Sequence, residues 1–589
     1  MGSKAGREAL RPEPPPEDRP HGYFVRGSHA PRGIVWYGFR SFWGHAQHFI
    51  ASAIATEDID SRDWMHADDP RTLASDIAAL LSASNPGKDS LTEKLDRDLI
   101  VDYLADTGDD VSVAEAVADL VFARWMLPDP ERPGETLDLG RGELLVFGGD
   151  TAYPVATAAE IHARVIVPFN RALSKVRDLD PPGTRRVILG IPGNHDWYDG
   201  LDGFGRLFRR RFGEHALEQE EPTLAAGRET RLEHVVQFVE KFVVGGQVDK
   251  QKTLSLEGYV PVQQASYFAL PLAPGIDWLA ADRQLRHVDY RQRKFFAMWR
   301  EQRFRQHLLV MLPDPVYAFQ EPSHTGVESA RALELDLKNV PHLVLSGDVH
   351  HYERLQVDAS LHVTAGGGGA FLHPARLSAE GLPKASAQFP GPVATRALLW
   401  RVPFRVMFGR AGFIPHVVML CLFAPALEIG VRLFGDADQA SLVAGVVAAL
   451  VLALLADIRN RPRAKAVRVS ILAAVAGAAM GVVPTLASVP FTMLHVHVGP
   501  RADMMLTLLV ATFVGAFVFG AYLAALTALG LENTQAFTAL GHPGYKHFLR
   551  LRVRRDGSAI DGFCIGLVDP LAKDAKPVLV DSWTWRPRA

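Results

Sequence analysis

Five short apolar runs recur in the N-terminal part of the chain, and each stops at a glycine or proline that polar side chains follow. They read DLIVDYLADTGDD, ELLVFGGDTAYP, RRVILGIPGNHDWYDG, HLLVMLPDPVY and HLVLSGDVHHYER. Short apolar runs that end at a glycine or proline predict buried β-strands. Stretches with helical spacing, such as TAAEIHARVIVPFNRALSKV, separate several of them. This alternation predicts a layered α/β fold.

A second pattern begins after about residue 410, where long apolar segments follow one another. They cover roughly 411–434, 441–456, 469–494 and 506–530. The last has no charged residue and is long enough to cross a hydrocarbon core. The second is short, and prolines interrupt the first and third, which helix neighbours can accommodate in a membrane. The pattern predicts four transmembrane helices. Glu428, near the end of the first, is either a functional carboxylate or one that reaches the interface.

Charged residues alternate along the flanks of these segments. Arginine and lysine gather before the first segment, between the second and third, and after the fourth. The first connection carries Asp436 and Asp438 without a basic residue, and the third offers only Arg501. Because basic flanks stay on the cytoplasmic side, we predict that both termini and the large N-terminal region are cytoplasmic.

Composition narrows the class of protein. A chain of 589 residues exceeds what one hydrophobic core supports, so we expect several domains. A net charge of −3 gives no reason to expect a nucleic-acid partner. Two cysteines exclude a disulfide framework and a thiolate metal site.

The two patterns together predict four regions. Residues 1–32 form a disordered Pro-rich tail, 33–405 the large α/β domain, 411–530 the membrane domain, and 541–589 a small C-terminal β unit with an Asp-Gly hairpin signal. Within the second region, residues 33–55 predict an aromatic-rich helix, either in the core or at the membrane surface.

The polar residues after the strands carry the candidate chemistry. Ligands in α/β folds bind beyond the carboxyl ends of the strands, so these side chains are expected to converge on one crevice. Aspartates, an asparagine, a tyrosine and histidines are too many polar groups to bury together without cations. Mixed imidazole and carboxylate donors suit Fe, Mn or Zn better than a Mg-only site.

The motifs GGD, GNHD and GDVHHY, in this order, resemble the calcineurin-like metallophosphoesterase superfamily over about residues 98–373. GDTAY is similar to the purple acid phosphatase GDxxY variant, and GDVH to the alkaline phosphatase D GDxH variant. The resemblance implies a layered β-sandwich flanked by helices. It also implies a metal-dependent phosphoesterase that hydrolyses a phosphomonoester or phosphodiester by means of a metal-activated water.

The resemblance further implies a dinuclear metal centre. The first ion, Fe or Mn, would take Asp106, Asp150, Tyr153 and His350 as ligands. The second ion, Mn, Mg or Ca, would share Asp150 and add Asn194, Asp348 and Asp314. Catalytic roles would fall to His195, which protonates the leaving oxygen, and to Asp196, which orients that imidazole.

This sequence departs from the superfamily pattern at the second ion. Both of its histidines are missing, with Pro313 or Asp314 in one place and Asp348 in the other. His351 has no role in the pattern and is expected at the surface. The four glycines of HVTAGGGGAFLHP allow either a close backbone approach to a ligand or a tight turn.

Two functions therefore remain open. One is a membrane-anchored phosphoesterase acting on soluble or lipid-linked phosphate esters. The other is a catalytically weak membrane-bound sensor or scaffold that keeps the same fold.

Overall fold

The computed structural model describes residues 31–39, 41, 65–181, 183–211, 254–283, 287–303, 307–378, 381–434, 437–455, 462–493 and 499–587. The predicted disordered tail lies almost entirely outside these residues. The predicted helix over 33–55 is described only at 33–39 and 41, where residues 33–35 have no regular structure and a turn follows before residue 39.

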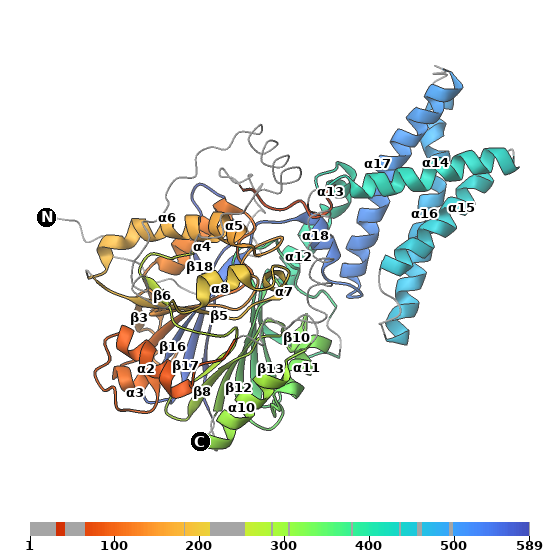
Figure 1. The fold of residues 1–589 in the computed structure, drawn as a ribbon. Helices are drawn as coiled ribbons and strands as arrows, with labels where there is room; N and C mark the ends of the chain where they lie inside the picture. Colours follow the sequence, from red (N-terminus) through yellow and green to blue (C-terminus); the bar gives the residue numbers. More distant parts are fainter. Residues whose placement is uncertain are drawn as a thin grey trace.

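Two seven-stranded sheets form the centre of the soluble part (Figure 1). The first has the order β18 (Val578–Trp585), β17 (Ile560–Leu567), β16 (Lys546–Val553), β1 (Leu99–Leu104), β4 (Leu144–Phe147), β5 (Arg186–Gly190) and β6 (Tyr259–Pro261). The second has the order β15 (Ala385–Phe389), β13 (Tyr352–Val357), β14 (Ser360–Ala365), β12 (His342–Ser346), β9 (His307–Leu312), β8 (Ile276–Ala280) and β7 (Phe268–Ala273).

The sheets pack face to face because alternate residues of their central strands are apolar. Val101 of β1 and Val146 of β4 share one core with Leu309 of β9 and Leu343 of β12. Strands β1, β4, β5 and β6 are parallel, as are β8, β9, β12 and β14. Parallel strands have both faces covered, which explains their continuous apolar runs. The predicted α/β class is confirmed.

Helices and two short hairpins complete this part. The helices are α2 (Pro70–Leu80), α3 (Leu91–Leu95), α4 (Val111–Phe122), α5 (Ala158–Ile161), α6 (Val167–Val176), α7 (Asn194–Trp197), α8 (Asp202–Phe208), α10 (Tyr290–Gln302) and α11 (His324–Ala332). The hairpins are β2 (Trp125–Pro128) with β3 (Thr136–Leu139), and β10 (Tyr317–Ala318) with β11 (Glu321–Pro322). Val117 of α4 and Phe169 of α6 pack on the outward residues of the first sheet, such as Phe147.

The C-terminal strands belong to the first sheet, which corrects the prediction of a separate small β unit. β16 pairs antiparallel with β1, with Asp102 opposite Arg550. β17 and β18 then extend the sheet as a meander. The local sequence pattern predicted the hairpin of β16 and β17. It did not show that β16 also pairs with β1, which precedes the apolar segments in the sequence. The chain therefore leaves the sandwich, forms the apolar helices and returns to complete it.

Four helices coincide with the predicted spans, and they project from the sandwich (Figure 1). They are α14 (Ile414–Phe434), α15 (Ala437–Leu455), α16 (Arg463–Met493) and α17 (Pro500–Ala528). Within the described residues, two are long and apolar enough to cross a membrane, over Arg463–Ala487 and Ala502–Ala528. The apolar parts of α14 and α15 are shorter, at Ile414–Ala426 and Val443–Leu454. The structure thus supports a membrane span for two of the four predicted helices.

The junction between the two parts is rich in exposed aromatic side chains. It contains α12 (Pro392–Leu399), α13 (Val402–Met407) and, after α17, α18 (Gln535–Leu540). Trp400, Phe404 and Phe408 are 79%, 53% and 59% exposed, at a spacing that places them on one side of this segment. Soluble surfaces seldom expose such a stripe, whereas aromatic side chains are enriched at membrane interfaces.

Candidate metal centre

Three of the predicted ligands follow strand ends in a left-handed backbone conformation. Asp106 follows β1, Asp150 follows β4 and Asp348 follows β12, with φ of 59°, 48° and 63°. Aspartate tolerates this region better than most residues, but such positions cluster where function constrains the backbone. The turns are joined, because the Thr107 N–H donates to the Asp150 carbonyl at 3.0 Å and the Asp348 N–H to Asp106 Oδ2 at 2.9 Å. Strands from both sheets therefore bring their carboxylates to one edge.

The Tyr153 hydroxyl lies at the centre of the predicted first-ion ligands. It is 3.0 Å from Asp106 Oδ1, 3.2 Å from Asp150 Oδ2 and 3.0 Å from His350 Nε2. His350 Nδ1 is 2.8 Å from the Phe371 carbonyl oxygen. Because a carbonyl only accepts, Nδ1 carries the proton and the lone pair of Nε2 faces the cluster. All four residues are buried. The structure brings together the whole set predicted for the first ion.

Glycines let the backbone close around these carboxylates. A Cβ at Gly193 would lie 2.2 Å from Asp150 Oδ1, and one at Gly366 would lie 2.5 Å from Asp106 Oδ2. Side chains at these positions would push the carboxylates out of place. The glycine-rich loop therefore comes close to the Asp106 carboxylate.

The electrostatics of the cluster call for a cation. Burial, and then the carboxylates of Asp106, Asp196 and Asp348, raise the pKa of Asp150 well above its usual range. Burial, and then the carboxylates of Asp106, Asp150 and Asp348, also raise the pKa of Tyr153. Both shifts favour the neutral forms of these two side chains. A bound cation would reverse both effects, because it stabilises the deprotonated ligands.

The spacing of the donors fits one ion. Metal–donor lengths of about 2.0–2.2 Å place neighbouring donors about 3.0–3.5 Å apart in octahedral or tetrahedral coordination. The contacts of Tyr153 fall in this range, and His350 Nε2 lies 3.5 Å from Asp106 Oδ1. Among the described residues, no three His, Cys, Asp or Glu side chains form such a set by themselves. The tyrosine completes it.

His195 stands beside this cluster at the start of α7. Its ring centroid is 4.4 Å from that of Tyr153, and its backbone N–H donates to Asp150 Oδ1 at 2.9 Å. Its Nδ1 lies 2.6 Å from the Pro154 carbonyl oxygen. The backbone thus positions the residue, and the carbonyl fixes the proton on Nδ1.

The prediction that Asp196 orients the imidazole needs correction. The Asp196 carboxylate accepts hydrogen bonds from the backbone N–H groups of Gly193, at 2.9 Å, and Thr151, at 3.3 Å. Burial raises its pKa to about 6. Asp196 therefore joins the two turns that carry Asp150 and His195, whereas Pro154 holds the ring itself. Asp196 is thus linked to His195 through the backbone of these turns.

The residues predicted for a second ion are less well arranged. The Asn194 side-chain amide donates to the Tyr198 hydroxyl at 3.1 Å. Asp314 Oδ2 is 2.6 Å from Arg283 Nη1, so this carboxylate already has a cationic partner. Asp348 reaches solvent on one side, yet desolvation by the surrounding protein, then Asp314 and Asp106, raise its pKa, and Arg283 opposes that shift. Arg283 therefore pairs with one of the carboxylates predicted as a ligand of the second ion.

Sequence reasoning missed several neighbours of the site. Trp36 packs edge-on against Tyr153 and His195, at 6.0 Å between ring centroids. Lys546, at the start of β16, is buried, and burial lowers its pKa to about 7 while Asp109 and Asp106 oppose the shift. The aromatic run in the sequence around Trp36 could have indicated that this residue lies near the site. No motif in the sequence around Lys546 indicated the same for the lysine.

His351 also departs from its prediction as a surface residue. It is 1% exposed, with its Nδ1 2.8 Å from the Pro374 carbonyl oxygen, and burial lowers its pKa. Its ring packs against Phe319. It supports the loop behind His350 without reaching the predicted ligands.

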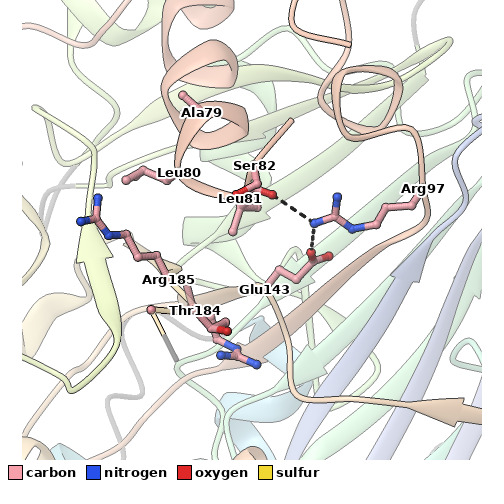
Figure 2. Close-up of a pocket in the computed structure, with 10 residues that line it drawn as sticks. Ala79, Leu80, Leu81, Ser82, Arg97, Glu143, Thr184 and Arg185 are labelled. Carbon is pink, nitrogen blue, oxygen red and sulfur yellow. Dashed lines mark hydrogen bonds and ion pairs between the residues drawn. The ribbon is translucent and has the colours of Figure 1, made fainter. Parts of the chain in front are cut away.

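A pocket of about 700 Å³ lies elsewhere, beside the start of β4 and β5 (Figure 2). Arg97 points across it to Glu143, and the two form an ion pair. This is the amino end of the parallel strands, opposite to the edge that gathers the metal donors. We therefore assign no part of the candidate centre to it.

Comparison with known proteins gives partial likenesses. No family model and no curated protein matches the chain. A solved structure described as "GAP50 the anchor in the inner membrane complex of Plasmodium" is 12% identical and covers 47% of this chain and 73% of that one, with a TM-score of 0.25. A second solved structure, "Structure of PhoD", is 8% identical and covers 47% of this chain and 58% of that one, with a TM-score of 0.24. The chain thus spans less than two thirds of the PhoD structure.

Proposed function

We propose that this chain is a membrane-associated, metal-dependent phosphoesterase. The observation that carries the proposal is the set of four donors formed by the Tyr153 hydroxyl with Asp106, Asp150 and His350, with His195 beside it. Imidazole, phenolate and carboxylate donors favour a transition metal such as Fe or Mn in the first position. A bound ion of this kind supplies Lewis acidity and a water of lowered pKa.

The side chains around the ion divide the remaining work. Asp106, Asp150, Tyr153 and His350 hold the cation from the buried side. His195 faces the substrate and protonates the leaving oxygen as the bond from phosphorus to that oxygen breaks and water forms the new one. Since Pro154 keeps a proton on Nδ1, the proton that moves is the one on Nε2. Hydrolysis then yields an alcohol and a phosphate or phosphomonoester.

The apolar helices and the aromatic stripe support a membrane location. A catalytic domain at the membrane would lie near lipid head groups, so lipid-linked phosphate esters are the substrate class we favour over soluble ones. The segment that carries Trp36 supports this coupling, since the Tyr37 N–H donates to the Ala411 carbonyl and the Ile414 N–H to the Tyr37 carbonyl, both at 3.1 Å. The start of α14 is therefore tied to Tyr37, the residue next to the tryptophan that packs on Tyr153.

Purified full-length protein tests the proposal. Elemental analysis is expected to find tightly bound Fe or Mn, and an aryl phosphate mono- or diester is expected to be hydrolysed in a metal-dependent manner. Metal without turnover would favour the sensor or scaffold function. Absence of bound metal, with no turnover after reconstitution with Fe or Mn, would contradict the proposal.

The arginine alternation gives a separate prediction about topology. A reporter active only in the cytoplasm is expected to work when fused after Arg463 or at the C-terminus, and to fail when inserted near Asp436 or Arg501. The soluble reporter serves as a control for expression. The opposite pattern would place the catalytic domain on the other side of the membrane.

A further inference from the structure

We propose that Arg283 replaces the second metal ion, so that the centre holds one metal and one guanidinium group. This inference rests on the proposed function and concerns the side of the site that faces Asp314 and Asp348. A permanent positive charge from the protein would then stand where related two-metal sites place a second cation.

The geometry around Arg283 carries the inference. Its Nη1 lies 2.6 Å from Asp314 Oδ2, and the two side chains are 11% and 15% exposed. Asp314 belongs to the turn after β9, and the Pro313 carbonyl of that turn accepts the Gly347 N–H at 3.2 Å. A backbone hydrogen bond therefore joins the Asp314 turn to the turn that carries Asp348, and the ion pair adds Arg283 to them.

The chemistry of the donors points the same way. Two histidine ligands are absent from the positions where the resemblance leads one to expect them, and the carboxylate at one of those positions is paired with Arg283. Such a nearly buried ion pair is costly to break, because it would leave an uncompensated charge in a desolvated place. A divalent cation that took Asp314 as a ligand would compete with the guanidinium for this carboxylate.

An arginine in this position also has a chemical use. The guanidinium group has five N–H donors in a planar fork, and those not engaged by Asp314 suit the oxygens of a phosphoryl group. Arg283 would then bind the substrate phosphate beside the metal. Unlike a labile cation, its charge does not depend on metal supply or on pH in the physiological range.

The test is the metal content of the full-length protein after equilibration with excess Mn²⁺ and removal of weakly held ions. We expect one equivalent per chain in the wild type and in Arg283→Lys. Arg283→Ala leaves Asp314 without its cationic partner and is expected to bind a second Mn²⁺, which spin coupling between the two ions would reveal. In protein loaded with one equivalent, Arg283→Ala should bind inorganic phosphate roughly 10–100-fold more weakly.

Arg186→Ala is the matched control. Arg186 is 10% exposed and makes two 2.9 Å hydrogen bonds to Asp180, far from the metal donors at the other end of β5. Loss of the Arg186 side chain should leave the metal content at one Mn²⁺ per chain. Two Mn²⁺ ions in the wild type, or one in Arg283→Ala, would overturn the inference while the phosphoesterase proposal stands. No metal in the wild type would overturn both.

Discussion

Replacing His195 by alanine is expected to lower turnover by roughly 10²–10⁴ while the metal content stays unchanged, the usual effect of losing a positioned general acid. The bond to Asp150 comes from the backbone N–H of residue 195, so alanine retains it. The imidazole itself is not among the four donors around the cation. Elemental analysis and initial rates on the same preparation separate the two effects.

The way in which the rate depends on the acidity of the leaving group distinguishes a general acid from a residue with a structural role. An ester with a strongly acidic leaving group needs little protonation, so the deficit of His195→Ala should shrink for such substrates. Asp150→Ala is the contrasting variant and is expected to lose metal and turnover together. A His195→Ala enzyme with wild-type rates on poorly activated esters would show that the acid has been misassigned.

The convergence of the predicted ligands could be foreseen because their geometry is local to each strand end. An apolar strand followed by a turn that carries an aspartate fixes where a carboxylate leaves the sheet, and parallel strands bring such ends to one edge. Asp106 and Asp150, predicted for the first ion, and Asp348, predicted for the second, follow this rule. Tyr153 follows it as well, since it lies in the turn that Asp150 begins.

The neighbours that complete the site could not be predicted, because contacts between distant parts of the chain bring them there. Arg283 follows β8 without a motif, and its partner Asp314 is identified only by contact. Lys546 arrives from beyond the apolar helices, because β16 pairs with β1. His351 was misjudged because a polar residue after a strand is usually exposed, whereas here the Pro374 carbonyl and Phe319 enclose it. Long-range packing decided each case.

The membrane segments show a similar limit. Hydropathy and flanking arginines predicted the positions of four helices, and α14–α17 occupy them. The apolar part of α14 ends before Glu428, and that of α15 is short. Composition therefore located the helices but did not establish that each crosses a bilayer.

Arg550→Ala is expected to reduce the free energy of unfolding by about 3–5 kcal/mol, as for other buried ion pairs that lose one partner. Arg550 and Asp102 are both fully buried, and their bidentate hydrogen bonds measure 2.7 and 2.9 Å. Arg550 also donates to the Val121 and Ala123 carbonyls, which would lose a donor. At about 2 °C per kcal/mol for a large domain, the thermal midpoint should fall by roughly 6–10 °C.

The same strand supplies the control. Arg552 pairs with Asp98 at 2.7 Å, but these side chains are 21% and 37% exposed, so Arg552→Ala should cost less than about 1 kcal/mol. Arg550→Met combined with Asp102→Leu removes both charges and should recover most of the loss. Because β16 also carries Lys546 behind Asp106, Arg550→Ala should weaken metal retention as the strand loosens. Equal midpoints for Arg550→Ala and Arg552→Ala would show that the buried pair does not hold the C-terminal strands to β1.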